Sequence, residues 1–333
     1  MGPMASASPT SLAAAVANAG GMGGCGALNL QPAAIRAWTA QFRSQSNGGF
    51  QINLWIPDPT PHRDPVAEAR VRDFLRQWGP EVAPEAGDAS LPDFAGQCEA
   101  VIEAGPSAVS SIMGLYPDAV VARMKAKGIK WFATVTTVSE ARAAVDAGAD
   151  VLVASGMEAG GHRGAFDAAR AEANLVGLFS LIPAVADAVS VPVVAAGGIA
   201  DARTLAAALL LGASAVQIGT AFLRCPEANL PAVYADAIGR TLPEQTMITR
   251  AMSGRAARSI ATPYVKAAAA SDAPPPAPYP VQRGLTQAMR AATVKSGALD
   301  GMQAWAGQSA AMARTETAGE VVRRLWEGAQ TLL

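Results

Sequence analysis

The chain has 333 residues, of which 50% are hydrophobic and 16% charged, and its formal net charge is −1. A charge this close to zero, with no block of like charges, argues against a nucleic acid or a membrane surface as partner. The cysteines Cys25, Cys98 and Cys225 fit neither a disulfide framework nor a zinc site, and they suggest a reducing compartment. Neither a signal peptide nor an apolar run of bilayer-spanning length is visible, so we expect a cytoplasmic protein.

Short apolar runs alternate with Ala- and Leu-rich helical patterns through much of the chain. This alternation predicts an α/β fold with parallel strands and helical crossovers, and eight strands are the number that closes a (β/α)8 barrel. The expected strands are Met1–Ala5 (the remnant of a first strand, entered without a lead-in), Gly21–Gly26, Phe50–Trp55, Ala108–Gly114, Ile129–Val135, Val151–Ser155, Pro192–Gly197 and Ala215–Thr220. The expected helices are Thr10–Ala19, Pro32–Arg43, Pro65–Trp78, Pro117–Lys127, Ser139–Ala147, Val176–Val189 and Ala202–Leu211.

The pattern changes after the eighth expected strand. We expect residues 1–225 to form the barrel, with a proline-rich insertion at about 56–106. Residues 226–333 are expected to form a smaller, mainly helical addition that packs over the barrel mouth as a substrate-binding or lid region. Within it, Asp272–Pro280 predicts a semi-rigid linker or wrapping segment, and Leu285–Leu333 predicts helices.

A glycine-rich loop with a histidine, Ser155–Gly164, follows the apolar run Val151–Ala154. Glycines let backbone approach a ligand closely, and a histidine exchanges protons near neutral pH. His162 is therefore the candidate for proton transfer, and a surface or helix-capping histidine is the alternative. Glu158 either hydrogen-bonds to His162 or is a solvated carboxylate. His62, the second histidine, lies in an expected exposed loop and has no assigned role.

Two further glycine turns follow the seventh and eighth expected strands. In a barrel, ligands gather at the carboxyl ends of the strands, and the loops after these two strands commonly bind phosphate. Ala196, Gly197 and Gly198 end the seventh strand, and Gln217, Gly219 and Thr220 lie at the end of the eighth. Backbone N–H groups exposed by glycines and a helix N-terminus suit an anion. Either turn alone could be a plain strand-to-helix turn, but two on successive strands predict a phosphate-bearing ligand.

Other polar residues are more ambiguous. Asn53, inside an apolar strand, either satisfies neighbouring backbone or contacts the ring edge of a cofactor. Thr134 and Thr136 lie near the end of a strand in which threonine is simply a good strand former. Met252–Arg258 contains Ser253 and either binds an anion through its arginines or is a solvated helix start. Trp305–Gln308 is a candidate lid, while Trp305 itself is the better candidate for an aromatic anchor.

These motifs together resemble the nitronate monooxygenases, formerly called 2-nitropropane dioxygenases. The loop Glu158–Gly164 (EAGGHRG) and the segments MSGR and WAGQ look most like the class I enzymes. The missing lead-in before Gly2 departs from the family and leaves strand one in doubt. The segments that carry the resemblance are Gly2–Met4, Leu12–Gly21, Asn53–Leu54, Met157–Gly164, Ala195–Ile199, Gln217–Phe222, Met252–Arg258 and Trp305–Gln308.

The resemblance implies an FMN-dependent barrel that oxidises alkyl nitronates with O₂ to carbonyl compounds and nitrite through a flavin semiquinone. Neutral nitroalkanes are a further possible substrate. His162 matches the catalytic histidine of the family, and Ser253 and Gln308 are candidate substrate contacts. The matched cofactor residues are Pro3, Met4 and Asn53 beside the isoalloxazine, Gln217 at its side, Thr134, Ser155, Gly156 and Ala196 along it, and Gly197, Gly198, Gly219 and Thr220 at the phosphate.

Two other functions are compatible with the same residues. A similar barrel and glycine-histidine loop occur in flavin-dependent enoyl-acyl-carrier and quinone reductases, which use NAD(P)H. A flavin-free barrel that binds a sugar phosphate would also need the two glycine turns. The fold does not separate these functions, because the site decides them. We expect no metal, no nucleic acid and no membrane partner, and either a monomer or a homodimer.

Overall fold

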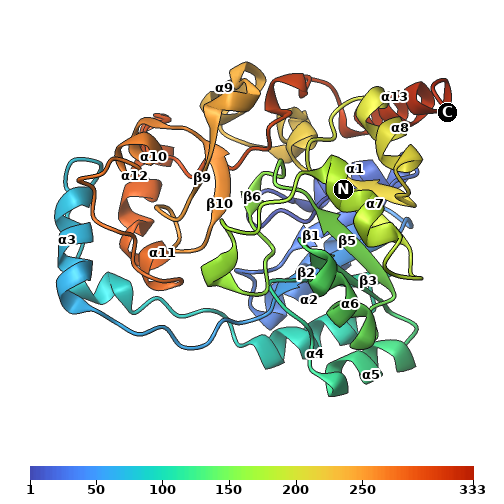
Figure 1. The fold of residues 1–333 in the computed structure, drawn as a ribbon, viewed down its shortest axis with the longest axis horizontal. Coiled ribbons are helices and arrows are strands. Elements are labelled where there is room, and N and C mark those ends of the chain that lie inside the picture. The colour runs from blue at the N-terminus through green and yellow to red at the C-terminus, as the bar shows by residue number, and fades with distance from the viewer.

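A curled sheet of seven parallel strands forms the centre of the protein, and the computed structural model describes residues 1–333 (Figure 1). The strands follow each other in chain order around the barrel, because each is joined to the next by a helical crossover. The strands are β1 (Gly23–Gly26), β2 (Phe50–Trp55), β3 (Ala108–Ile112), β4 (Lys130–Val135), β5 (Val151–Ser155), β7 (Val193–Ala196) and β8 (Ala215–Gln217).

The first residues of the chain fill the gap between β8 and β1. The amide of Gly2 donates to the carbonyl of Ile218 at 2.7 Å, and Ala5 forms a parallel bridge with Gly26. The close approach of Ala5 to β1 needs glycine at position 26, because a Cβ on Gly26 would lie 2.3 Å from the backbone nitrogen of Ala5. The segment thus takes the place of the expected first strand, although only Ala5 has the pairing of a bridge. The fold is a (β/α)8 barrel, as predicted.

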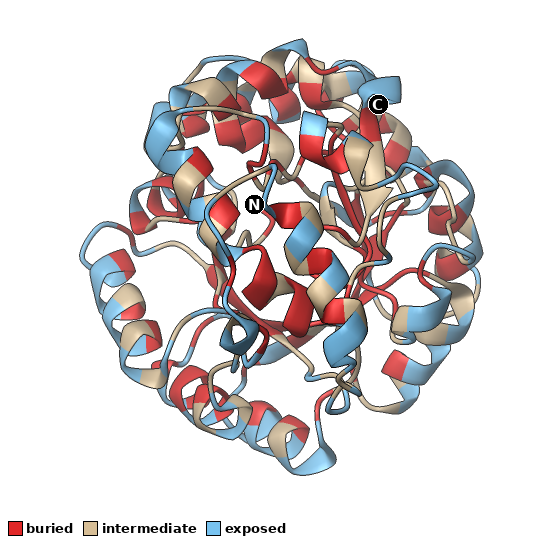
Figure 2. Cartoon of the chain, turned by 90° about the vertical axis from the view of Figure 1, so that its left-hand side faces the viewer, coloured by how far each residue is buried: buried red, intermediate tan, exposed pale blue.

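The barrel is covered by helices that bury one face each. Figure 2 shows buried residues on their inward sides and exposed residues outward. The last helix belongs to this layer, since Val321 and Leu325 are buried in the main core and the helix packs on α1 and α8. The helices are α1 (Thr10–Asn18), α2 (Pro32–Arg43), α4 (Phe94–Ala104), α5 (Asp118–Ala126), α6 (Val138–Asp146), α7 (Leu178–Ala186), α8 (Ala202–Leu210) and α13 (Ala318–Gln330).

A second, smaller lobe lies to one side of the barrel in Figure 1. Its core joins Val71 and Leu75 from the early part of the chain to Met252, Tyr264 and further apolar residues from the later part. Its helices are α3 (Pro65–Leu75), α10 (Pro263–Ala267), α11 (Val281–Leu285) and α12 (Gln287–Ser296), whereas α9 (Ala232–Arg240) packs on the 3₁₀ helices Thr220–Arg224 and Ala310–Met312. The short 3₁₀ helices of the chain are Pro84–Gly87, Ala168–Arg170, Thr220–Arg224, Pro226–Ala228, Pro243–Gln245 and Ala310–Met312.

A three-stranded antiparallel sheet connects this lobe to the barrel. It consists of β6 (Gly161–His162), β10 (Ala257–Ile260) and β9 (Thr246–Thr249), in that order across the sheet. The sequence patterns did not predict this sheet, because its strands are short and two of them pair across almost a hundred residues. Through the pairing of β6 with β10, this sheet places the loop Ser155–Gly164 next to the segment that contains Ser253.

Two stretches of the chain differ from the expected helical pattern. Phe94–Ala104, within the span assigned to the insertion, is a helix whose apolar side enters the main core beside β2. Residues 298–309, expected to be helical, run without a helix between α12 and Ala310. The division of the chain at residue 225 stays a prediction.

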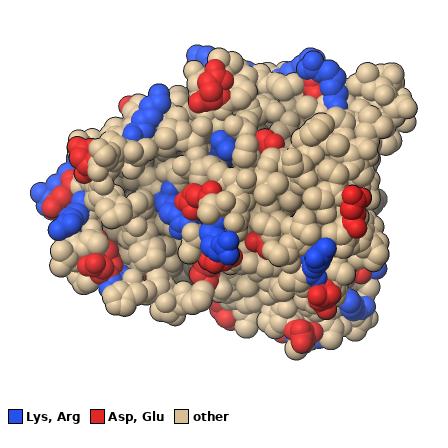
Figure 3. Space-filling view, in the orientation of Figure 1, with Lys and Arg blue, Asp and Glu red and all other residues tan.

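The surface carries charges of both signs without a single-sign patch on the face drawn in Figure 3. This matches the balance of 26 Lys and Arg against 27 Asp and Glu. Across the structure, every helix is too short or too polar to cross a lipid bilayer.

Candidate active site

His162 lies on β6, directly beyond the carboxyl end of β5. Gly161, at φ +80°, turns the chain into β6, where His162 pairs with Ala257 of β10 in antiparallel register. A side chain with φ in this range is strained, so glycine is the residue that this turn favours. The histidine is therefore held in a small sheet rather than in a free loop.

Three distant segments converge on the imidazole of His162. Its Nε2 lies 2.7 Å from the Oγ of Ser253. The rings of Trp55 and Trp305 meet it edge-on, with centroids at 4.7 and 5.0 Å. The structure places Ser253, a predicted substrate contact, against His162, and its contact with substrate stays a prediction. Trp305 borders His162 and also packs against the core of the second lobe, and its role as lid or anchor stays a prediction.

Burial keeps the imidazole neutral. Desolvation, followed by the positive charges of Arg255, Arg283 and Arg290, lowers the pKa of His162 from 6.5 to about 3. A histidine with this pKa is neutral at neutral pH, so one ring nitrogen has a lone pair that can accept a hydrogen bond or a proton.

The direction of the serine hydrogen bond sets which nitrogen of His162 carries the proton. Ser253 Oγ lies 3.3 Å from the carbonyl of Arg255, to which it donates. If its proton is used there, Oγ accepts from Nε2–H of His162, and the lone pair lies on Nδ1. Nδ1 makes no hydrogen bond within the protein and is not sealed off from the mouth.

The turns after β7 and β8 present unpaired donors. Gly197 and Gly198 have φ of +113° and +67°, and the amides of Gly198, Ile199 and Gly219 donate to no protein acceptor. Most backbone N–H groups in folded proteins are paired, so a group of free amides on adjacent turns suits an anion. The hydroxyl of Thr220, in contrast, accepts from the amide of Gly307 at 3.1 Å.

Asn53 and Gln217 expose complementary groups toward the barrel interior. The side-chain amide nitrogen of Asn53 donates to the carbonyl and the hydroxyl of Ser110, at 3.3 and 3.1 Å. The side-chain oxygen of Asn53 therefore remains available as an acceptor. Gln217 accepts from Gln51 at 2.9 Å, which leaves its amide nitrogen as a donor. The oxygen of Gln51 is buried without a partner. A heterocycle with donors and acceptors along its edge fits such a set.

The remaining predicted cofactor residues surround the same opening. Met4 packs close to Gly219, where an added Cβ would lie 3.4 Å from its sulfur. Thr134 and Ser155 are buried and their side chains make no hydrogen bond to the protein. Pro3, Gly156 and Ala196 lie on the segment or strand ends next to them, since Ser155 pairs in register with Ala196.

Buried arginines hold the loop after β5 from below. Arg163 donates to the carbonyls of Ser155 and Gly156, and Arg258 donates to the carbonyl of Met157 at 2.8 Å. Arg255 pairs with Asp58 at 2.8 Å. Met252–Arg258 is therefore not a solvated helix start, because both arginines are buried and Arg255 is paired with a carboxylate.

Glu158 also differs from both of its expected roles. Its carboxylate accepts from the amide of Leu178, at the start of α7, at 2.9 and 3.1 Å. The positive end of the helix stabilises this carboxylate, so Glu158 caps α7 and is not a partner of His162.

The segment Trp305–Ser309 covers the strand ends. Gln308 donates its backbone amide to the carbonyl of Glu158 at 2.9 Å, and Ser309 donates its hydroxyl to the carbonyl of Gly198 at 2.7 Å. Gly160 and Gly307 lie so close that a Cβ on Gly160 would be 2.5 Å from the nitrogen of Gly307. The segment thus bridges the histidine loop and both glycine turns.

Sequence reasoning missed two aromatic residues of the site. Trp55 ends β2, a position at the barrel mouth that could have marked it as a candidate. Tyr279 packs on Trp55 with ring centroids at 5.7 Å, and its buried hydroxyl has no partner. It lies in a proline-rich segment without periodicity, so no local signal pointed to it.

Comparison with known proteins agrees with this geometry. The family model described as nitronate monooxygenase matches residues 1–328. The nitronate monooxygenase of Pseudomonas aeruginosa is 38% identical over 98% of this chain and 94% of its own length. That of Paraburkholderia phytofirmans is 38% identical over 97% of this chain and 89% of its own length.

Solved structures give the same relationship. A nitroalkane oxidase from Streptomyces ansochromogenes superimposes with a TM-score of 0.92 and 34% identity, covering 99% of this chain and 96% of its own. FabK from Thermotoga maritima superimposes with a TM-score of 0.76 and 27% identity, covering 100% of this chain and 92% of its own.

Proposed function

Since the chain belongs to the nitronate monooxygenase family, we propose that it is an FMN-dependent enzyme that oxidises alkyl nitronates with O₂ to carbonyl compounds and nitrite. The observation that carries this proposal is the neutral His162. It is held by Ser253 between two tryptophans, at the mouth that also carries the unpaired amides of the glycine turns.

The residues at the mouth fit FMN. The free amides of Gly198, Ile199 and Gly219 would hold its phosphate. The acceptor of Asn53 and the donor of Gln217 would meet the polar edge of the isoalloxazine. When bound, FMN would supply the electron transfer and the reaction with O₂.

His162 would handle the substrate in one of two ways. Toward a neutral nitroalkane, the lone pair on Nδ1 removes the proton on the carbon next to the nitro group and forms the nitronate. Toward a nitronate supplied as the anion, no proton needs removing, and the residue only positions the substrate. The enzyme would therefore depend on His162 more strongly for nitroalkanes than for nitronates.

The aromatic residues would exclude water from the reacting atoms. Trp55 and Trp305 border both sides of His162, and the segment that begins at Trp305 bridges the histidine loop and the glycine turns. A drier site strengthens the electrostatic interactions of bound anions with their donors. This supports a small, largely apolar nitronate as substrate.

The test is the visible spectrum of the purified protein without oxygen, before and after an alkyl nitronate is added. The proposal predicts a flavin absorption band that changes on addition. A flavin band that is unchanged by nitronate but changes on addition of NAD(P)H would support the reductase alternative. The superposition with FabK also favours this alternative. A colourless protein that cannot take up FMN would exclude both.

A further inference from the structure

An apolar pocket of about 180 Å³ lies at the carboxyl ends of the first three strands of the barrel. Leu28 follows β1, Trp55 ends β2 and Met113 follows β3. The pocket therefore belongs to the barrel mouth, where ligands of this fold gather. The rest of its apolar wall comes from Ile56, Leu91 and Phe94.

Three aromatic rings connect the apolar pocket to His162. The ring centroids of His162 and Trp55 lie 4.7 Å apart, and those of Trp55 and Tyr279 lie 5.7 Å apart. Trp55 and Tyr279 both line the pocket, so the pocket shares a wall with the surroundings of the imidazole. A ligand held at His162 can therefore extend along Trp55 into the pocket.

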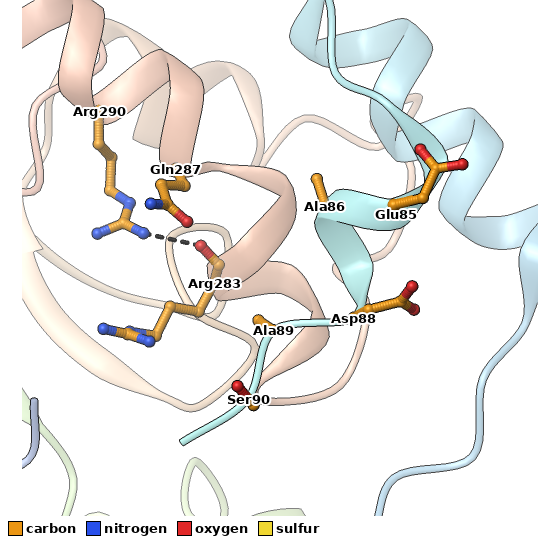
Figure 4. A pocket seen from close by; sticks show the side chains of 8 residues that line it. All are labelled: Glu85, Ala86, Asp88, Ala89, Ser90, Arg283, Gln287 and Arg290. Atoms are coloured by element: carbon orange, nitrogen blue, oxygen red, sulfur yellow. Dashed lines mark hydrogen bonds between the residues drawn. The ribbon is translucent and has the colours of Figure 1, made fainter. Parts of the chain in front are cut away.

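A larger cavity, of about 530 Å³, lacks both properties. It is lined by Arg283, Gln287 and Arg290 on one side and by the stretch Glu85–Ser90 on the other (Figure 4). Most of these side chains are polar, and the larger cavity shares no lining residue with the apolar pocket. It is therefore not an extension of the site for an apolar group.

The apolar pocket contains no uncompensated charge. The carboxylate of Asp58, at its edge, pairs with Arg255 at 2.8 Å. Gln97 donates its side-chain amide to the carbonyls of Ala27 and Leu30, at 2.9 and 2.8 Å. Because the charge is neutralised and the amide is used within the protein, the pocket favours an apolar occupant over a second anion.

Met113 gives the apolar pocket an adaptable wall. Its φ of +72° is a conformation that residues with a Cβ rarely adopt, and strain of this kind gathers at functional sites. The next residue, Gly114, is tightly packed, because a Cβ there would lie 2.9 Å from Cγ2 of Ile56. The thioether side chain of methionine is flexible, so it adapts to occupants of different shape.

The volume of the apolar pocket sets the size of its occupant. An apolar cavity of about 150 Å³ accommodates a benzene molecule, so a pocket of about 180 Å³ accommodates about six carbon atoms. We propose that the apolar pocket binds the alkyl chain of the nitronate, and that the enzyme therefore prefers chains of about six carbons to two-carbon nitronates. This inference rests on the proposed function, because it names the substrate class of the same site.

The test compares straight-chain nitronates from ethyl to octyl on protein saturated with FMN. The value of kcat/KM should rise by up to about fourfold for each methylene that becomes buried, and it should stop rising once the pocket is full. Hexyl nitronate should therefore exceed ethyl nitronate about tenfold or more. Equal values of kcat/KM for ethyl and hexyl nitronate would overturn the proposal.

Leu91 is the position at which the apolar pocket can be resized. It is half-buried in the loop before α4, so replacements there leave the main core unchanged. Leu91→Trp should fill the pocket and lower the hexyl-to-ethyl ratio of kcat/KM toward one, whereas Leu91→Ala should move the highest kcat/KM to longer chains. Leu242→Trp, in the exposed loop after α9, adds the same bulk away from the pocket and should keep the ratio of the parent protein. A parent-like ratio in Leu91→Trp would contradict the proposal.

Calorimetry with acetate and hexanoate measures the same preference without turnover. A carboxylate resembles a nitronate, since both are planar anions with two oxygens. Hexanoate should bind FMN-saturated protein about tenfold or more tightly than acetate, and Leu91→Trp should abolish this difference. Equal binding of the two acids, or no binding of hexanoate, would overturn the proposal. A preference for hexanoate in a protein that does not oxidise nitronates would instead mark a failure of the proposed function alone.

Discussion

Ser253 Oγ and His162 Nε2 lie 2.7 Å apart although 91 residues separate them in the chain. The serine reaches the histidine because β10 pairs with β6 and places the preceding turn beside the imidazole. This contact holds the Nε2 edge of a histidine whose pKa is far below its ordinary value.

Replacing His162 with asparagine tests its role as base. His162→Asn should retain FMN, because the glycine turns and Asn53 are unchanged. Turnover of neutral nitroalkanes should fall by about 10² or more, the usual contribution of a positioned general base. Turnover of preformed nitronates should fall much less. Steady-state kinetics with nitroethane and ethyl nitronate measure the difference, and an equal loss on both would remove His162 from this role.

Replacing Ser253 with alanine tests the tautomer. Ser253→Ala removes the acceptor of Nε2–H, so the lone pair on Nδ1 is no longer enforced, and kcat/KM for nitroalkanes should fall about tenfold. Ser259 offers a matched control, since it is a buried serine of β10 that donates to the carbonyl of Ala304 at 3.0 Å. Ser259→Ala should lower Tm without the selective loss on nitroalkanes. If both variants lose activity alike, the contact of Ser253 is structural only.

The low pKa of His162 predicts a loss of stability in acid. As pH falls from 6.5 toward about 3, the unfolded chain takes up a proton at this residue while the folded protein does not. The free energy of unfolding should decrease over this range and level off below it. Urea unfolding of FMN-free protein measures this, and His162→Gln should have a shallower pH dependence. His62→Gln is the control, and an identical slope for both variants would contradict the predicted pKa.

Replacing Gly198 with alanine tests the phosphate turn. Gly198 and Gly297 have nearly equal φ, +67° and +69°, so alanine is strained by a similar amount, about 1–2 kcal/mol, at either position. A Cβ on Gly297 meets nothing within 4 Å, whereas one on Gly198 contacts Glu158 at 3.4 Å. Both variants should lose similar Tm, but only Gly198→Ala should bind FMN at least tenfold more weakly. Equal FMN affinities would place the phosphate elsewhere.

Local patterns were enough for the barrel. The alternation of apolar runs and helical segments predicted all seven strands of the sheet to within a few residues, and the eighth position is taken by the first residues of the chain. These signals are reliable because a strand buried on both faces is apolar at most of its positions. The helix Phe94–Ala104 was missed, because a proline-rich stretch precedes it and masks its start.

The sequence by itself determined the barrel, the two glycine turns and the candidate histidine, because each depends on neighbouring residues whose conformation is set locally. Only the tertiary structure decided what surrounds His162. Ser253, Trp55 and Trp305 come from three distant segments, and Arg255 and Arg258, open to several interpretations in the sequence, are buried in pairs and carbonyl contacts. Contacts of this kind form between residues that are far apart in the chain, so they depend on the entropy lost on closing long loops and on which surfaces then pack together. No local sequence pattern contains this information.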